Sequence, residues 1–195
     1  IQNNAVGNGI YINNVPAVIT GNLLTTSGRG MEITNQAGTE VTNNTIISSG
    51  GDYGVYIADF SAPIVRHNII HGFQNGIYAD NDLLNYNISY NDLWQISGDL
   101  FSGSAMPPII GEIIDQNLNG DPADIYYNIS MDPLYIDGEN ADYNLQSDSP
   151  CINAGLPAIL DPDGTIADMG AMPASLPNIV AYTIPEIAYL EPGEE

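Results

Sequence analysis

The fold is decided by residues 54–70, GVYIADFSAPIVRHNII, because this stretch contains two short motifs that recur along the chain. The first is a glycine followed by alternating apolar residues, here Gly54-Val55-Tyr56-Ile57. The second is an aliphatic residue, an asparagine three positions later and another aliphatic residue two positions after that, here Val65, Asn68 and Ile70. Short alternating runs rich in Ile and Val are typical of strands. Each copy of the motifs therefore predicts β-structure.

The asparagine motif occurs five times, and its asparagines lie 18, 22, 24 and 23 residues apart. They are Asn4, Asn22, Asn44, Asn68 and Asn91. The glycine motif recurs between them, at Gly9, Gly30, Gly54 and Gly76. The spacing varies while the motifs persist, as in a solenoid that carries loops on one face without disturbing its stack. A repeat of roughly 22 residues with several short strands is typical of one coil of a parallel β-helix.

A more specific signal follows the repeats, in a series of short segments. They are YNDLW (90–94), DPLY (132–135), DYNLQ (142–146), SPCINAG (149–155), DPDGT (161–165) and ADMGA (167–171). This series resembles the closing segment of large, secreted, multidomain β-helix proteins of bacteria, although Met172 replaces the usual aromatic residue. The chain as a whole resembles right-handed parallel β-helix proteins, which include pectate lyases and exported surface proteins. The resemblance implies an all-β, right-handed parallel β-helix of about five regular coils, followed by irregular C-terminal closing coils.

Four regions are expected along the chain. Regular coils should occupy residues 1–94, and a long loop excursion rich in Gly and Pro should occupy 95–131. Closing coils should follow over 132–172, and a Pro-rich acidic tail or a side-packed strand over 173–195. Because the first repeat begins at Ile1, with no preceding signal sequence, we expect a portion of a longer exported protein.

Charge and composition exclude several functions. The chain has 24 acidic residues against two Lys plus Arg, which gives a net charge of −22. Binding to nucleic acid or to anionic lipid draws on clustered basic residues, which this sequence does not have. A single cysteine, Cys151, excludes a disulfide framework. No apolar stretch approaches the 18 residues that a membrane-spanning helix needs.

The register of the repeats assigns roles to their residues. In each glycine-led strand, the first and third residues after the glycine should point into the core. The repeated asparagines should lie at a bend, where they tolerate a left-handed φ and bond to their own turn. Stacked from coil to coil, their side-chain amides predict a hydrogen-bonded ladder.

The residue two positions after each glycine should point outward. Tyr11, Glu32, Tyr56 and Tyr78 occupy these positions. Tyrosine rings stacked at the coil spacing would form a strip that packs on sugar faces while the hydroxyl groups form hydrogen bonds. The simpler alternative is that the rings stack on each other, as aromatic residues on strand surfaces do.

Catalysis is the second hypothesis. The resemblance to pectate lyases implies a Lys or Arg as the base, and only Arg29 and Arg66 are present here. A glycoside hydrolase would need paired carboxylates about 5–10 Å apart. The candidates are Asp59, Asp80 and Asp82, which fall near equivalent positions on successive coils.

Calcium is the one cofactor that the sequence favours. Asp161 and Asp163 alternate before Gly164, as in loops that bind hard cations, and Asp168 could add a ligand. The alternative is a turn that needs no ion.

Together these features predict a secreted or cell-surface β-helix with a structural or adhesive function and no catalysis. Its partner would be a glycan, another cell-surface component or further copies of itself. The alternatives are a polysaccharide-active enzyme, either hydrolase or lyase, and a filament subunit that stacks end to end.

Overall fold

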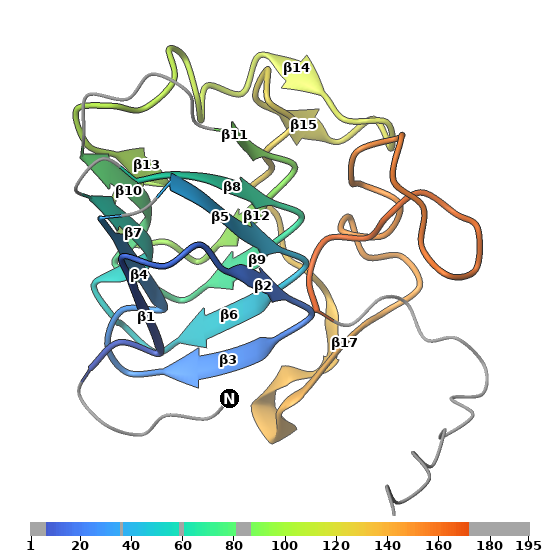
Figure 1. The fold of residues 1–195 in the computed structure, drawn as a ribbon. Coiled ribbons are helices and arrows are strands. Elements are labelled where there is room, and N and C mark those ends of the chain that lie inside the picture. Colours follow the sequence, from blue (N-terminus) through green and yellow to red (C-terminus); the bar gives the residue numbers. More distant parts are fainter. Residues whose placement is uncertain (1–6, 36, 59–60, 81–86, 172–195) are drawn as a thin grey trace, which may run out of the picture.

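In a computed structural model of the chain, residues 7–35, 37–58, 61–80 and 87–171 are described (Figure 1). Their strands wind into four coils of three strands each. The strands are β1 (Ile10–Asn13), β2 (Val18–Thr20), β3 (Leu23–Thr26), β4 (Met31–Thr34), β5 (Ala37–Thr42), β6 (Thr45–Ser48), β7 (Tyr53–Ala58), β8 (Ala62–Arg66), β9 (Ile69–His71), β10 (Asn75–Asp80), β11 (Asn87–Ser89) and β12 (Asp92–Trp94). Corresponding strands of successive coils pair in parallel, which gives the sheets β1-β4-β7-β10-β13, β2-β5-β8-β11 and β3-β6-β9-β12.

The predicted fold class is confirmed, because the chain forms a right-handed parallel β-solenoid. The number of coils differs slightly from the prediction of about five. The described residues form four coils, and the first predicted coil begins in residues 1–6, which lie outside the described part.

The core lies inside the coils and follows the predicted alternation. Met31, Val55 and Ile77 are register partners on β4, β7 and β10, and all three are fully buried. The repeated glycines also have a steric role. A Cβ atom at Gly54 would collide with the side chain of Ile70 across the coil, and one at Gly76 would collide with the backbone of the next coil. Only glycine lets the coils approach this closely.

The sequence predicts a loop over residues 95–131, and the structure shows only part of this segment as a loop. Strand β13 (Phe101–Ser102) pairs in parallel with β10, so the chain starts a further coil. It then leaves the stack as an antiparallel hairpin of β14 (Asp115–Gln116) and β15 (Pro122–Ala123) and returns at Ile129, which bridges to Asp92. The hairpin covers the end of the stack (Figure 1).

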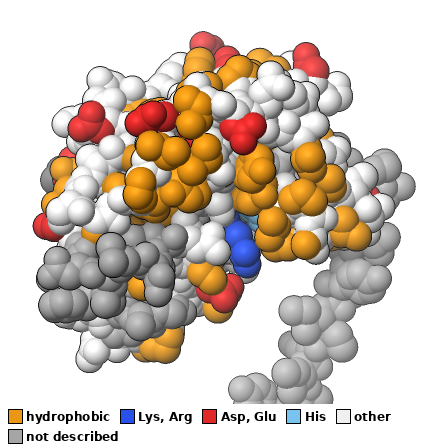
Figure 2. Space-filling model, turned by 90° about the horizontal axis from the view of Figure 1, so that it is seen from above, with side chains coloured by type: hydrophobic (Ala, Val, Ile, Leu, Met, Phe, Trp, Pro, Cys, Tyr) orange, Lys and Arg blue, Asp and Glu red, His pale blue; other side chains and the backbone are white. Residues whose placement is uncertain are grey.

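Apolar side chains are exposed on this covering segment. Ile109, Ile113, Ile114, Leu118 and Ile125 are 39–64% exposed. Figure 2 shows apolar side chains gathered over much of this end. End-to-end stacking through strand edges would require the hairpin to move away.

The segment 132–171 differs from the prediction of closing coils. It contains an antiparallel hairpin, β16 (Tyr135–Asp137) and β17 (Asp142–Leu145), joined by the short 3-10 helix η1 (Gly138–Asn140). It packs along the side of the stack, against the outer face of β3-β6-β9-β12 (Figure 1). The reason is an apolar outward residue on this face, Ile69, which Cys151 and Met169 cover in a second hydrophobic cluster.

The tail predicted over 173–195, and Met172, lie outside the described residues. In the described part of the chain, no helix is long and apolar enough to cross a membrane.

Candidate functional site

The repeated asparagines lie in one hydrogen-bonded column. The side-chain Nδ2 of Asn22 donates to Oδ1 of Asn44, and the same bond joins Asn44 to Asn68 and Asn68 to Asn91, each at 3.0 Å. Each Oδ1 also accepts the backbone N–H of the preceding asparagine at 3.0–3.1 Å. Asn44, Asn68 and Asn91 are fully buried, so this ladder satisfies polar groups that cannot reach water. Asn4 lies outside the described residues.

The column continues beyond the predicted repeats. Nδ2 of Asn91 donates to Oδ1 of Asn128 at 3.0 Å, and Nδ2 of Asn128 donates to Oδ2 of Asp124 at 3.0 Å. The Asp124 carboxylate also accepts the backbone N–H groups of Gly111, Tyr126 and Asn128 at 2.8–2.9 Å. Sequence reasoning missed both residues. The one available signal was Ile125, three positions before Asn128, because Ser130 stands where the motif has its second aliphatic residue.

The left-handed conformation falls one residue earlier than predicted. The positive φ belongs to the residue before each ladder asparagine, and the values lie between 52° and 67°. These residues are Gly21, Asn43, His67, Tyr90 and Tyr127. The ladder asparagine still bonds to its own turn, as Asn68 Nδ2 does to the carbonyl of Arg66 at 3.0 Å.

Two of the residues with positive φ, His67 and Asn43, hold the C-terminal segment against the coils. Nε2 of His67 accepts the backbone N–H of Leu156 at 2.9 Å, and the His67 carbonyl accepts that of Gly170 at 2.8 Å. Asn43 Nδ2 donates to the carbonyl of Asp168 at 3.1 Å. Burial, helped by the charge of Arg66, lowers the pKa of His67 to about 4. His67 is therefore a neutral acceptor at pH 7.

A second contact joins the same two parts of the chain. Asp92 is fully buried on β12, and its carboxyl group lies 3.5 Å from the Cys151 Sγ and accepts the Met131 N–H at 3.0 Å. Burial raises the pKa of Asp92 to about 8. Burial also raises the pKa of the Cys151 thiol, with the nearby Asp92 adding to the shift. Both groups are thus held neutral at pH 7 and serve the packing of the segment.

The outward aromatic strip lies on the sheet β1-β4-β7-β10-β13. Tyr11, Glu32, Tyr56 and Tyr78 are register partners, as predicted from the repeat. The rings of Tyr56 and Tyr78 stack 4.8 Å apart at an interplanar angle of 5°. Tyr53 packs against both rings, with centroid distances of 5.3–5.4 Å. We call Tyr11, Tyr53, Tyr56 and Tyr78 the tyrosine strip.

Arg29 closes one end of the stacked rings. Its guanidinium carbon lies 4.0 Å from the centroid of Tyr56, and the group forms ion pairs with Glu32 at 2.9 Å and Asp52 at 3.1 Å. Both faces of Tyr56 are therefore covered, one by Arg29 and the other by Tyr78. The next register partner of Tyr78 is Ser102, which is too small to cover a ring. Tyr11 is 56% exposed.

The carboxylates of the catalytic hypothesis are only partly described. Asp59 and Asp82 lie outside the described residues. Asp80 is exposed, and its Oδ1 accepts the hydroxyl of Ser104 at 2.8 Å.

The three aspartates of the predicted calcium loop each bind the chain itself. Asp161 accepts the N–H of Asp168 at 2.9 Å, and Asp168 accepts that of Asn153 at 2.7 Å. Asp163 accepts the hydroxyl of Thr165 at 2.7 Å, which lowers its pKa. Burial raises the pKa of Asp161, and the charges of Asp168 and Asp163 add to the shift. No group of three or more His, Cys, Asp or Glu within the described ranges is arranged to hold a metal ion. Calcium binding stays a prediction.

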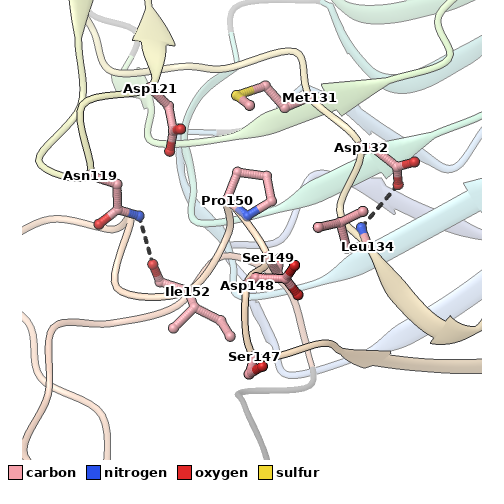
Figure 3. A pocket seen from close by; sticks show the side chains of 10 residues that line it. All are labelled: Asn119, Asp121, Met131, Asp132, Leu134, Ser147, Asp148, Ser149, Pro150 and Ile152. Atoms are coloured by element: carbon pink, nitrogen blue, oxygen red, sulfur yellow. Dashed lines mark hydrogen bonds between the residues drawn. The ribbon is translucent and has the colours of Figure 1, made fainter.

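A pocket of about 500 Å³ opens between the end hairpin and the C-terminal segment (Figure 3). Three stretches distant in sequence line it, around residues 119–121, 131–134 and 147–152. Asp121, Asp132 and Asp148 contribute carboxylates, and no sequence motif had indicated that they share a site.

A parallel coil with an internal asparagine ladder defines the class of protein, a β-helix scaffold. The chain belongs to the family described as the right-handed β-helix region, whose model matches residues 1–117. Comparison with curated proteins and with solved structures gave no match.

Proposed function

We propose that the chain is a non-catalytic, extracellular β-helix module that contacts glycans through the tyrosine strip. The observation that carries this proposal is the geometry of the strip. Its rings project from one parallel sheet, and the rings of Tyr56 and Tyr78 stack nearly parallel to each other. Rigid aromatic groups lose little entropy on binding, and their hydroxyl groups can bond sugar hydroxyls.

The stacking changes which rings would contact the sugar. Arg29 and Tyr78 cover both faces of Tyr56, so Tyr56 would act as a support. Tyr78, whose next register partner is the small Ser102, and the exposed ring of Tyr11 would pack on the sugar. The Arg29 guanidinium and the Glu32 carboxylate, on the same face, would supply polar contacts.

The use of the other polar groups supports a passive function. His67, Asp92 and Asp124 are buried, and each bonds to backbone N–H groups of the chain. These groups hold the scaffold together and are not directed at a ligand.

The test is binding to a panel of neutral and acidic polysaccharides, compared among three single variants. Tyr11→Ala and Tyr78→Ala should weaken binding at least fivefold, whereas Tyr126→Ala, on the covering segment, should leave it within twofold. All three should keep the cooperative melting of the parent. Equal binding by all three would refute the proposal.

The same panel tests the enzymatic alternative. We expect neither new reducing ends nor the absorbance of unsaturated uronates after incubation. Either product would show turnover and would direct attention to the carboxylates of Asp59, Asp80 and Asp82.

A further inference from the structure

The pocket beside the end hairpin combines an apolar floor with an acidic rim (Figure 3). Met131, Leu134, Pro150 and Ile152 provide the apolar surface. Asp121 reaches it from the hairpin, and Asp132 and Asp148 lie on the other two stretches that line the pocket. Its volume of about 500 Å³ is in the range of sites that take small ligands or single side chains of a partner.

The rim carboxylates have no cationic partner in the described part of the chain. Asp148 has no hydrogen bond or ion pair there, and Asp132 accepts only the N–H of Leu134, at 3.0 Å. Asp121 accepts the amide of Asn117 at 3.2 Å. The ion pairs among the described residues are both formed by Arg29, far from the pocket, and the sequence contains no lysine.

We propose that this pocket binds a lysine side chain of a partner polypeptide. The methylene stem of lysine would pack on the apolar floor, and the ammonium group would lie among the rim carboxylates. A compact ammonium with three donors suits carboxylates that come from separate stretches, whereas arginine favours a single bidentate acceptor. The net charge of −22 would attract a basic partner before contact. This inference is independent of the tyrosine strip, which lies on the sheet β1-β4-β7-β10-β13 and contributes no residue to the pocket.

The probe is a fluorescein-labelled tetralysine peptide, measured by anisotropy at about 0.1 M salt, where long-range attraction is screened. Asp148→Asn and Asp121→Asn should each weaken binding at least fivefold. Glu139→Gln and Asp163→Asn remove the same charge from exposed positions outside the pocket, and they should change binding less than twofold. An equal loss for all four variants would mean general attraction to an acidic surface and would overturn the proposal.

Two further peptides test the stem and the charge. A peptide of four acetylated lysines should not bind, because it has no ammonium groups. A peptide of four ornithine residues, whose stems are one methylene shorter but carry the same charge, should bind several-fold more weakly than tetralysine. Equal binding by the short-stem peptide, or tighter binding of spermidine than of tetralysine, would contradict a site built for lysine.

Discussion

The side-chain amide of Asn91 donates to Oδ1 of Asn128 at 3.0 Å across 37 residues of sequence. The ladder therefore continues past the repeated asparagines and ends on a carboxylate, that of Asp124. All its amides donate in one direction, from Asn22 toward Asp124. Hydrogen bonds aligned in this way polarise one another, and a negative group at the donor end stabilises the series.

The first prediction is a gradient of stability along the ladder. Asn68→Ala would leave the carbonyls of Val41 and Arg66 without their side-chain donor in a buried site, so it should lower the free energy of unfolding by about 3 kcal/mol or more. Asn22→Ala, at the partly exposed start, should cost about 1 kcal/mol. Urea denaturation measures both values. Equal losses at the two positions would contradict the gradient, and the Asn22 variant remains informative if the Asn68 variant does not fold.

The second prediction concerns the carboxylate at the end of the ladder. Asp124→Asn would turn an amide NH2 toward groups that are themselves donors, so we expect a loss of about 3 kcal/mol. Asp115→Asn removes the same charge from an exposed residue of the hairpin and should change stability by less than about 0.5 kcal/mol. If the two variants lose the same amount of stability, Asp124 has no special role at the end of the ladder.

The third prediction follows from the pKa of Asp92, which burial raises to about 8 from the ordinary 3.8. Between these values the folded chain keeps a proton that the unfolded chain has lost. This group therefore lowers stability as pH rises, by about 1.4 kcal/mol per pH unit. Asp92→Asn should abolish that slope. The free energy of unfolding of the variant, relative to that of the parent, should therefore increase as pH rises from 5 to 8. Parallel pH profiles for the two proteins would exclude a neutral Asp92.

The fourth prediction has the opposite sign. Because the pKa of His67 is lowered to about 4 from 6.5, the unfolded chain takes up a proton in this window and the folded chain does not. Stability from His67 is thus lost as pH falls from 6.5 toward 4. Protonated Nε2 cannot accept the Leu156 N–H, so hydrogen exchange at Leu156 should accelerate in acid before exchange in the core does. His67→Asn should show fast exchange at Leu156 at every pH.

The two titrations largely offset each other in the parent between about pH 4 and 6.5, because they contribute slopes of opposite sign there. In the Asp92→Asn variant, the contribution of His67 should appear as stability that increases as pH rises from about 4 to 6.5.

Much of the coil was predictable from local pattern. Alternation after Gly54 and Gly76 placed the buried and outward residues, and the spacing of Asn22, Asn44, Asn68 and Asn91 predicted a column. Both signals are periodic, so each copy supports the others. The parallel pairing follows from the same repeat, whereas the described residues form four coils and not about five.

The contacts that could not be predicted from the sequence are those made by residues outside the repeat. Asn128 joins the ladder after a 37-residue gap. The bond from Asn128 to Asp124 could not be predicted without the hairpin, because the hairpin brings this part of the chain back to the ladder. The segment 132–171 was expected at the end of the stack, yet it packs on the side. The coil residues that hold it there include Ile69, His67, Asn43 and Asp92, and the spacing of the repeat does not predict these contacts. The covered faces of Tyr56 likewise depend on Arg29, a residue of the preceding coil.

The most direct test of the buried ladder is deuterium exchange at asparagine side-chain amides, followed by NMR. We expect the NH2 groups of Asn44, Asn68, Asn91 and Asn128 to exchange at least about 1,000-fold more slowly than that of exposed Asn87, because opening them requires opening the coil. Exchange of all five at a similar rate would show that the amides do not form a column inside the coil.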